Sequence, residues 1–402
     1  MRVFFPFAYY YPERCAGIYI ADDLMHALAD SGIDSYMSVP SPTRNLPKDA
    51  KWERTEKSVD GRITIHRFRM FKEGKNSLIR ALRYFFCEIA QLHSLLWKKY
   101  EVVFIDSTPP IQGLKLVVLR WFRKKKVIFN IHDLFPDSLV ATGMAQKNGL
   151  LWRIGSWVMK VTYRRVDKII TISEDIRKSL VARGVPEDKI EVVYNWVDAE
   201  AIRPVDKENN TLYEEFGLQR DKFTVVYAGN LGNSQNIDVI LDAASRLTDV
   251  RFVIFGTGGN EEEIKERITS EKIDNVTMLP LQPVERVSEV YSLGDACIVS
   301  CKPGFGGSAM PSKTWSIMAC GRPVIASFDE GELKDIVEKN DCGSFAHAGN
   351  ADELVKAIKE LAQDHARCSE MGKNARKFVM DNLTKEIGTK RYIDILFSVV
   401  KR

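Results

Sequence analysis

A glycine-rich loop followed by a lysine is the part of this sequence best suited to hold an anion. Residues 304–327 read GFGGSAMPSKTWSIMACGRPVIAS. The apolar run predicts a helix between Ser312 and Gly321, because serine favours the first turn of a helix and glycine the position after its end. Free backbone N–H groups at such a helix start, together with Lys313, would favour a phosphate group. The same residues also fit an ordinary loop and helix with Lys313 in solvent.

Other polar or small residues stand where predicted strands end, and small residues there let a backbone approach a ligand closely. His132 and Asp133 follow the strand KVIFN, and Asn195 follows EVVY. The remaining positions of this kind are Ala16, Gly17, Gly229, Asn230 and Gly256. A histidine at a strand end is often purely structural, and asparagine is common in turns, so the pattern alone fits a functional or a structural role.

Short β-rich runs alternate with helical segments along the chain, which predicts an α/β fold with parallel sheets. The polar stretch VDKENNTLYEEFGLQRDK divides this pattern into two similar halves. We therefore expect two doubly wound, Rossmann-like domains that face each other across a cleft, with ligands at the carboxyl ends of the strands. The N-terminal domain is expected over residues 1–205 and the C-terminal domain over 206–383, while a last helix over 384–402 could pack back on the N-terminal domain.

The commonest nucleotide-binding motifs of such folds are missing from the sequence. No GxGxxG follows the first strand of either half, where the chain reads YPERCAGIYI and GNLG. The pattern GxxxxGK[ST] does not occur either. Hydride transfer with a dinucleotide and the phosphate chemistry of P-loop enzymes are therefore disfavoured.

The composition is that of an ordinary globular protein. The chain has 402 residues, of which 45% are hydrophobic and 28% charged, and it has no uncharged apolar run long enough to span a membrane. Seven cysteines occur without a CxxC pair or a zinc-type spacing. They predict reduced, mostly buried thiols in a cytoplasmic protein and no metal site.

Basic residues concentrate in the N-terminal half of the chain. Between Arg62 and Lys126 there are 15 Lys and Arg residues against four Asp and Glu. The segments SLIRALRYFFCEIAQLHSLLWKK and LLWRIGSWVMKVTYRR combine basic charges with apolar residues at helical spacing. Such helices could lie on an anionic membrane surface, or could pack their apolar faces on the sheet, and both can hold at once. No motif for nucleic-acid recognition appears.

Six segments together resemble a known enzyme family. They read HDLFPDSLVATG, YNWVD, FTVVYAGNLGNSQNIDVILDAA, RFVIFGTGGN, NVTMLPLQPVERVSEVYSLGDACIVS and PSKTWSIMACGRPVIAS. In order and spacing, over nearly the whole length, they are similar to family 4 glycosyltransferases of the GT-B fold. The subgroup that they resemble most comprises bacterial surface-polysaccharide enzymes of the N-acetylfucosamine transferase type.

The resemblance implies a retaining transferase that needs no metal or other cofactor and works in the cytoplasm, at the inner face of the membrane. Its C-terminal domain would hold a nucleotide-diphosphate sugar, with UDP as the expected nucleotide and an N-acetylamino sugar as a candidate. Its N-terminal domain would hold a glycan or polyprenyl-diphosphate-linked acceptor. The residue implied to face the reacting sugar is His132. The residues implied to bind the donor diphosphate are Gly229, Asn230, Gly307, Ser308, Ser312 and Lys313. The other residues implied to line the cleft are Ala16, Gly17, Asp133, Asn195, Gly256 and Ser316.

The sequence departs from the family pattern at the donor site. Ser308 and Ser316 stand where relatives carry two glutamates, the second of which usually binds the donor ribose. A serine cannot supply a pair of carboxylate acceptors. Asn230 and Gln235 stand where relatives often place Arg and Lys. Because Ser308 cannot act as a carboxylate nucleophile, we expect front-face transfer, in which the leaving phosphate takes the proton of the acceptor.

Two other functions fit the same architecture. A sugar-nucleotide 2-epimerase would release a changed monosaccharide from the donor alone. A non-catalytic relative would bind the nucleotide sugar without turnover, and the two serines leave that alternative open.

Overall fold

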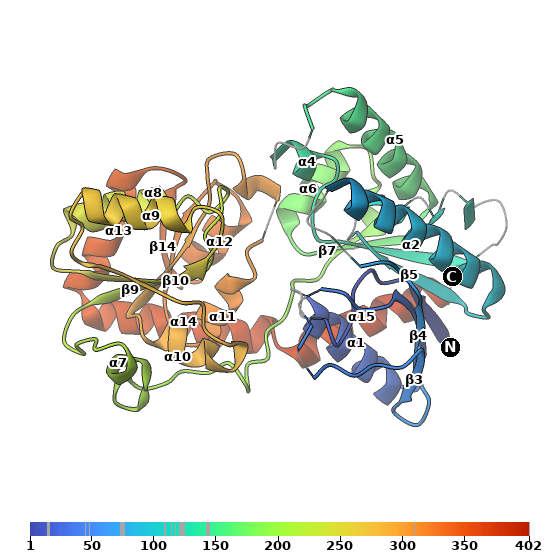
Figure 1. Ribbon diagram of the computed structural model, residues 1–402, viewed down its shortest axis with the longest axis horizontal. Coiled ribbons are helices and arrows are strands. Elements are labelled where there is room, and N and C mark those ends of the chain that lie inside the picture. The colour runs from blue at the N-terminus through green and yellow to red at the C-terminus, as the bar shows by residue number, and fades with distance from the viewer. Residues whose placement is uncertain are drawn as a thin grey trace. The chain divides into compact units, whose positions relative to one another are not determined.

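The chain folds into two compact units. The computed structural model describes residues 1–13, 17–44, 46–47, 49–72, 77–107, 110–113, 115–116, 118–119, 125–141, 145–308 and 310–401. The first unit comprises Met1–Tyr194 with Glu386–Arg402, and the second comprises Asn195–Lys385 (Figure 1). Residues 195–205, expected in the N-terminal domain, cluster with the second unit. The backbone N–H groups of Arg203 and Val205 donate to the hydroxyls of Ser288 and Ser292 at 3.1 and 3.0 Å, which ties this stretch to that unit.

The first unit is built on an eight-stranded sheet in its described part, with the order β3-β4-β2-β1-β5-β6-β7-β8. Its strands are β1 Arg2–Phe5, β2 Asp34–Pro40, β3 Thr55–Ser58, β4 Ile63–Phe68, β5 Val102–Asp106, β6 Lys126–Ile131, β7 Lys168–Thr171 and β8 Ile190–Val192. Neighbouring strands pair in parallel except the edge strand β3, which is antiparallel to β4.

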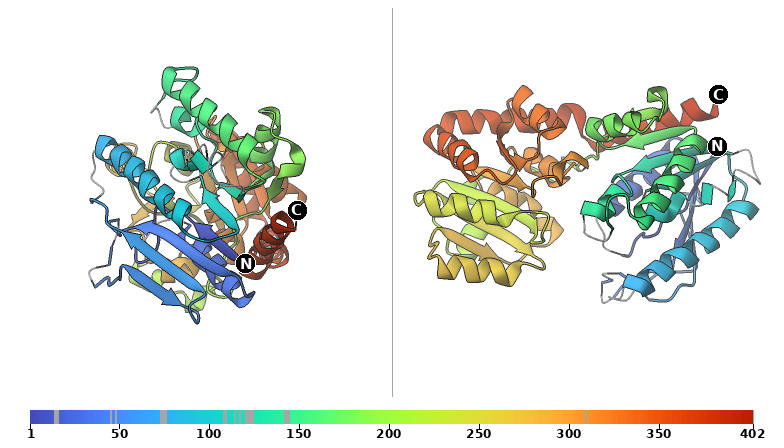
Figure 2. Two further views of the ribbon diagram at one scale, coloured as in Figure 1. Left: turned by 90° about the vertical axis from the view of Figure 1, so that its right-hand side faces the viewer. Right: turned by 90° about the horizontal axis from the view of Figure 1, so that it is seen from above.

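Helices cover both faces of this sheet. Helices α2 and α5 lie on one face, and α1 and α15 lie on the other (Figures 1 and 2). The described helical segments of the unit are α1 Ile18–Asp30, α2 Ser77–Trp97, η1 Pro110–Gly113, α4 Asp137–Ala141, α5 Leu150–Arg165, α6 Glu174–Ala182, η2 Glu187–Lys189 and α15 Lys385–Val400. The final helix therefore completes the first unit, far from most of it in sequence.

The second unit has a six-stranded parallel sheet with the order β11-β10-β9-β12-β13-β14. Its strands are β9 Thr224–Asn230, β10 Arg251–Thr257, β11 Val276–Leu279, β12 Ala296–Ser300, β13 Val324–Phe328 and β14 Gly343–His347. Its helices are α7 Leu212–Glu215, α8 Ile237–Arg246, α9 Glu261–Ser270, α10 Val287–Ser292, α11 Lys313–Ala319, α12 Glu332–Lys339, α13 Ala351–Gln363 and α14 His365–Asn382, with short 3-10 turns at η3 Lys207–Asn209, η4 Val284–Arg286 and η5 Gly306–Ser308. The predicted α/β fold with two Rossmann-like, parallel-sheet units is confirmed.

Burial of strands and helices forms the core that positions the strand ends of the second unit. Strands β12 and β13 are buried along their whole length, as parallel strands are when helices cover both faces of a sheet. On α8 the buried positions Ile237, Ile240, Leu241 and Ala244 recur at the spacing of one helical face. Removing such surface from water stabilises the fold by about 25 cal/mol per Å².

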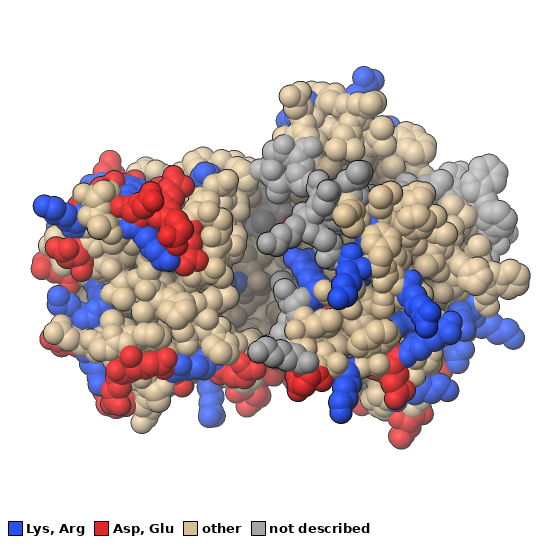
Figure 3. Space-filling view, viewed as in Figure 1, with Lys and Arg blue, Asp and Glu red and all other residues tan. Residues whose placement is uncertain are grey.

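The cysteines, the helices and the surface charges can be compared with what the composition predicts. The six described cysteines, Cys87, Cys297, Cys301, Cys320, Cys342 and Cys368, are free and buried, as predicted. Within the described segments no helix is both long and apolar enough to cross a membrane. On the face shown in Figure 3, acidic side chains gather over α9, whereas several Lys and Arg side chains lie together over the first unit.

Candidate functional site

The strand order of the second unit reverses direction between β9 and β12. The chain passes from β9 to β10 on one side of this point and from β12 to β13 on the other. Loops that follow the two strands therefore diverge and leave room for a ligand at the carboxyl ends of the strands. The predicted residues Gly229 and Asn230 end β9, and the predicted loop before Lys313 follows β12.

Lys313 is the first residue of α11, and its ammonium group lies against the end of β9. A Cβ atom built on Gly229 would lie only 2.6 Å from Lys313 Nζ. On its other side, Nζ stands 4.1 Å from the centre of the Tyr227 ring. No carboxylate of the described residues pairs with this ammonium, and burial alone lowers the pKa of Lys313 to about 8. A partly buried cation without a counter-ion is suited to bind an anion from solution.

Asp329 fixes the glycine-rich loop before α11. The backbone N–H groups of Gly304 and Gly306 donate to its two carboxylate oxygens at 3.0 and 2.7 Å. A Cβ on Gly306 would lie 2.7 Å from the ring of Phe328, whereas a Cβ on Gly307 would meet no atom within 4 Å. The loop is thus anchored from the end of β13 on one side and open at Gly307, where the sequence predicts contact with phosphate.

The backbone N-terminus of helix α11 contributes less to the site than the side chain of Lys313 does. It has seven residues, and Ser312, at its N-cap position, makes no capping hydrogen bond through its side chain. Ser312 is exposed, and Ser316 is partly buried one turn further along the helix. The side chain of Ser308 lies outside what the structure describes. Because the helix is so short, Lys313 is the main source of positive charge in this arrangement.

The two glycines predicted at the ends of β9 and β10 have different roles. Gly229, with φ of 145°, makes room for the lysine. Gly256 instead allows two backbones to pack, since a Cβ there would lie 2.4 Å from the carbonyl oxygen of Gly229. Asn230 is exposed, its carbonyl oxygen accepts from the Tyr227 hydroxyl at 2.8 Å, and its side-chain amide donates to Gln235 Oε1 at 3.2 Å. Tyr227 therefore fixes the end of β9 directly beside the lysine.

A hydrogen-bonded chain of side chains holds His132 in the first unit. Nε2 of His132 lies 3.3 Å from Oδ1 of Asp106, the residue that ends β5. The same oxygen accepts from Asn130 Nδ2 at 2.7 Å, and Asn130 Oδ1 accepts from the Tyr392 hydroxyl of α15 at 3.2 Å. The backbone N–H of His132 donates to Ser107 Oγ at 3.0 Å. The imidazole is thus positioned from β5, from β6 and, through Asn130, from the last helix.

Electrostatics favour the charged form of this imidazole. Burial opposes protonation, but the hydrogen bond to Asp106 and the charges of Asp106 and Asp133 outweigh it and raise the pKa of His132. Side-chain exposures of 24% for His132 and 20% for Asp106 leave the pair partly open to solvent. An imidazolium in this position could stabilise negative charge or donate a proton.

The remaining predicted residues are more loosely placed. Gly17 precedes α1 with φ of 83°, and a Cβ there would meet no atom within 4 Å. Asp133 is exposed. Asn195 is the first residue of the second unit, and its buried Oδ1 has no hydrogen-bond partner among the described residues. Ala16 lies outside the described residues.

Sequence reasoning missed the residues that support these two arrangements: Asp106, Asn130, Tyr392, Tyr227 and Asp329. Two of them left a signal, because an asparagine within the buried strand KVIFNI and an aspartate at the end of VVFID are both unusual in such strands. Tyr392 left none, since 262 residues separate it from Asn130.

Among the described residues, no three or more His, Cys, Asp or Glu side chains are grouped to hold a metal ion.

Comparison with known families now assigns both units. Residues 19–201 match the family model described as Glycosyltransferase Family 4, and residues 209–378 match the model described as Glycosyl transferases group 1. The chain belongs to these GT-B glycosyltransferases. The predicted family is thereby confirmed, and the two site arrangements fall one within each of the matched regions.

Two bacterial relatives illustrate how far this glycosyltransferase has diverged. It is 20% identical over 298 residues to the protein named Probable glycosyltransferase WbjE of Pseudomonas aeruginosa, which covers 73% of this chain and 74% of WbjE. It is 26% identical over 219 residues to WcaI of Escherichia coli K12, whose name assigns it to glycosyl transfer in colanic acid biosynthesis; 53% of this chain and 54% of WcaI are covered.

Solved structures share the fold of this glycosyltransferase over its whole length. Sucrose-phosphate synthase from Thermosynechococcus elongatus has a TM-score of 0.77 at 18% identity, with 99% of this chain and 98% of that one covered. HepE of Anabaena, solved in complex with UDP-glucose, has a TM-score of 0.72 at 13% identity, with 99% and 100% covered.

Proposed function

We propose that this glycosyltransferase is a retaining enzyme of bacterial polysaccharide biosynthesis. It moves a sugar, with an N-acetylamino hexose as the candidate, from a UDP-linked donor to a glycan or polyprenyl-diphosphate-linked acceptor. The observation that carries the proposal is the ammonium of Lys313, partly buried beside Gly229 with no paired carboxylate among the described residues. A diphosphate supplies the negative charge that this position lacks.

The site of the second unit supports a nucleotide-diphosphate donor. Lys313 and the loop through Gly307 stand at the reversal of strand order, where α/β sheets bind nucleotides. HepE, of the same fold, was solved with UDP-glucose. The anchoring of the loop by Asp329 means that little reorganisation is needed when the diphosphate binds.

The chemistry proposed follows from the groups present. As the bond to the donor sugar breaks, negative charge grows on the leaving diphosphate, and Lys313 with the backbone N–H groups of Gly307 and Ser308 stabilises it. No carboxylate stands at Ser308 to attack the sugar, so the acceptor hydroxyl attacks from the face that the diphosphate leaves and passes its proton to that phosphate. His132, held by Asp106, is proposed to stabilise the reacting sugar. This scheme uses no metal or other cofactor.

The acceptor is proposed from the charge of the first unit. Between Arg62 and Lys126 the sequence has 15 basic against four acidic residues. Arg67, Arg83 and Lys115 are buried and bonded within the unit, and the remaining excess favours an anionic partner, such as the diphosphate of a polyprenyl-linked glycan at the cytoplasmic membrane surface. WcaI, named for colanic acid biosynthesis, supports a polysaccharide role.

Calorimetric titration of UDP, UMP and uridine into the wild type and Lys313→Met tests the donor site. We expect the variant to lose about tenfold to a hundredfold in UDP affinity, because charge-assisted hydrogen bonds contribute about 1.5–3 kcal/mol. Uridine should bind both proteins equally. The matched control is Lys339→Met, which removes an exposed lysine paired with Asp335 at 3.1 Å. Equal UDP affinity of wild type and Lys313→Met would rule out this diphosphate site.

Transfer itself is tested with UDP-N-acetylhexosamines and short polyprenyl-diphosphate-linked glycans. The proposal requires UDP release that depends on the acceptor, and a product whose anomeric configuration by NMR equals that of the donor. Release of a changed free sugar from donor alone would point to an epimerase instead.

A further inference from the structure

Helix α2 turns apolar side chains to the surface of the first unit. The exposed ones include Leu82 at 46%, Phe85 at 52%, Phe86 at 49%, Ile89 at 50% and Trp97 at 74%. Four of them recur over two turns on the side of the helix that faces away from the sheet. An outward row of large apolar residues is unusual for a helix of a globular protein and indicates a surface made for contact.

Three polar residues of the same helix, Arg83, Glu88 and Gln91, are buried. Arg83 is 2% exposed and donates to the carbonyl oxygens of Phe71 and Ser41. Glu88 and Gln91 are likewise buried, and both accept from the buried ammonium of Lys115, at 2.8 and 2.6 Å. The helix therefore buries three hydrogen-bonded polar side chains beside the apolar Cys87 and Leu95, and it leaves several of its large apolar groups exposed.

Helix α5 lies on the same face of the sheet as α2 and repeats the pattern with added charge (Figures 1 and 2). Leu150, Leu151, Ile154 and Trp157 are exposed at 78%, 51%, 52% and 59%. The exposed residues Arg153, Lys160 and Arg164 follow one edge of this row. The helix contains no Asp or Glu, and the one acidic residue of α2 is the buried Glu88.

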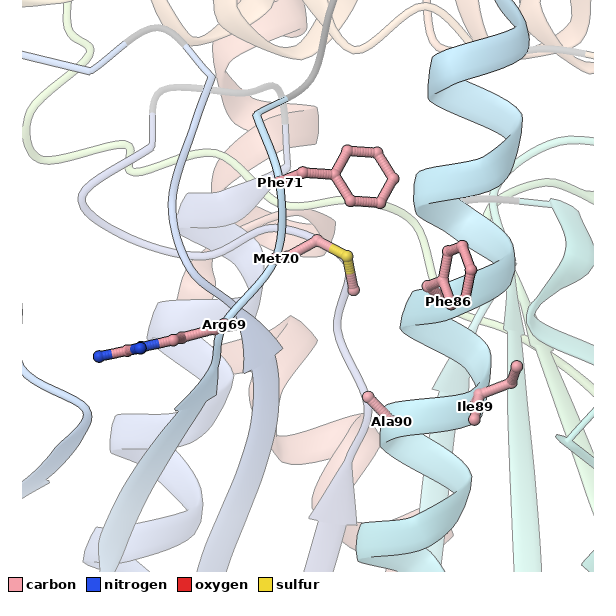
Figure 4. A pocket seen from close by; sticks show the side chains of 6 residues that line it. All are labelled: Arg69, Met70, Phe71, Phe86, Ile89 and Ala90. Carbon is pink, nitrogen blue, oxygen red and sulfur yellow. The ribbon is translucent and has the colours of Figure 1, made fainter.

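A crevice opens beside the outward row of α2. It has a volume of about 540 Å³ and is lined by Arg69, Met70, Phe71, Phe86, Ile89 and Ala90. In Figure 4 the Phe71 and Phe86 rings approach each other across it, with centroids 6.3 Å apart, while Arg69 turns the other way. The walls are thus apolar, and the guanidinium stays away from them.

We propose that the outward faces of α2 and α5 dock on an anionic lipid bilayer and that the crevice receives one acyl or prenyl chain from it. This deepens, and rests on, the proposed function, since it names where a lipid-linked acceptor is met. The charges favour a bilayer over a second copy of the chain. Two copies would bring basic helices together with no exposed acidic residue on either, whereas anionic headgroups complement Arg153, Lys160 and Arg164.

Flotation of the full chain with lipid vesicles tests the surface. We expect the wild type to float with phosphatidylcholine vesicles that contain phosphatidylglycerol, and to bind less in high salt. The double variant Ile89→Ser with Trp157→Ser should bind about tenfold more weakly, because it removes two large apolar groups from the contact. The matched control is Leu281→Ser with Val284→Ser, which removes side chains exposed at 54% and 72% on the second unit.

The crevice is tested with phosphatidylglycerol that carries a photoreactive diazirine in its acyl chain. Labelling should fall on peptides that contain Met70–Phe71 or Phe86–Ala90, and should disappear in Ala90→Trp, which fills the crevice. Labelling spread evenly over both units would rule out a defined chain site.

Two results would overturn the proposal. One is a wild-type protein that binds to none of the vesicle preparations. The other is an Ile89→Ser, Trp157→Ser double variant that binds to the vesicles as well as its control does. A concentration-dependent dimer that this variant dissociates would assign the surface to a second copy. The melting temperature of the same variants shows whether they fold. Their UDP affinity shows whether the donor site is intact, so that a failed lipid surface can be distinguished from a failed donor site.

Discussion

Oδ1 of Asp106 accepts a hydrogen bond from Asn130 Nδ2 at 2.7 Å and lies 3.3 Å from His132 Nε2. The aspartate ends β5, and the histidine follows β6, so the parallel register of two neighbouring strands brings them together. The pair is the basis of a first prediction on protonation.

Asp106→Asn should lower the pKa of His132, because it removes the negative charge of Asp106 and replaces its carboxylate acceptor by a weaker amide oxygen. The stability that His132 gains from its raised pKa is present below the ordinary value of 6.5 and is lost as the pH rises through the folded value. NMR titration of the histidine Cε1 protons follows the pKa directly. An unchanged His132 titration in Asp106→Asn would contradict the assigned role of this aspartate.

Tyr392→Phe should make the positioning of His132 less precise, because Tyr392 is linked to its partner Asp106 through Asn130. Loss of the hydroxyl leaves Asn130 Oδ1 without that donor, at about 1 kcal/mol of unfolding free energy. We expect slower transfer at unchanged UDP affinity, with a shifted His132 titration. Tyr213→Phe is the control, since its buried hydroxyl donates to the carbonyl oxygen of Leu293 at 2.8 Å in the second unit. If both variants lose the same stability and neither changes the His132 titration, the hydrogen bonds from Tyr392 through Asn130 have a structural role only.

UDP binding should be linked to protonation of Lys313. In the free protein its pKa is about 8, so above that pH the ammonium is mostly neutral and must regain a proton when the diphosphate binds. Affinity should therefore fall as the pH rises above 8, by up to about tenfold per pH unit. Calorimetry at pH 8.5 in buffers of different ionisation enthalpy measures the uptake, which Lys313→Met should lack. Affinity that is flat from pH 7 to 10 would argue against contact between Lys313 and phosphate.

Gly229→Ala should impair the same site without touching its charge. The new Cβ would meet Lys313 Nζ at 2.6 Å, at a backbone φ of 145° that side chains disfavour. The ammonium must then move, so UDP affinity should fall in parallel with Lys313→Met. Gly217→Ala, at φ of 63° with open space around it, controls for backbone strain alone.

Transfer should persist in excess EDTA, because Lys313 and the loop amides are proposed to carry the charge of the leaving diphosphate. Initial rates with and without Mg²⁺ check this expectation. A rate that collapses with EDTA and returns with Mg²⁺ would show that another cation shares that charge.

Much of this molecule was predictable because its signals are local. Alternating strands and helices predict the α/β fold, which is confirmed. The loop before Lys313 predicts an anion site from neighbouring residues, and that site stays a prediction. The sequence could not show that Lys313 lacks a carboxylate partner among the described residues, because that depends on every segment that folds around it. Asp329 and Tyr227 act on the loop and the strand end from other strands, so their roles appear only in the fold.

For helices α2 and α5, the sequence predicts the helices but does not predict which of their faces is buried. Their apolar spacing predicts amphipathic helices, and the sequence leaves open which face packs on the sheet. Lys115 decides the matter on α2, since its buried ammonium draws Glu88 and Gln91 inward. A partner outside the helix thus brings polar side chains onto its buried face.

The return of α15 to the first unit has a consequence for synthesis of the protein. The second unit, residues 195–385, is one uninterrupted stretch, whereas the first needs the last residues of the chain as well. Folding of the first unit therefore cannot be completed until the end of the chain is made and Tyr392 can reach Asn130. A chain truncated before α15 would keep nearly the whole second unit but leave the first unit incomplete, and any truncation that removes Tyr392 would act on His132 through Asn130.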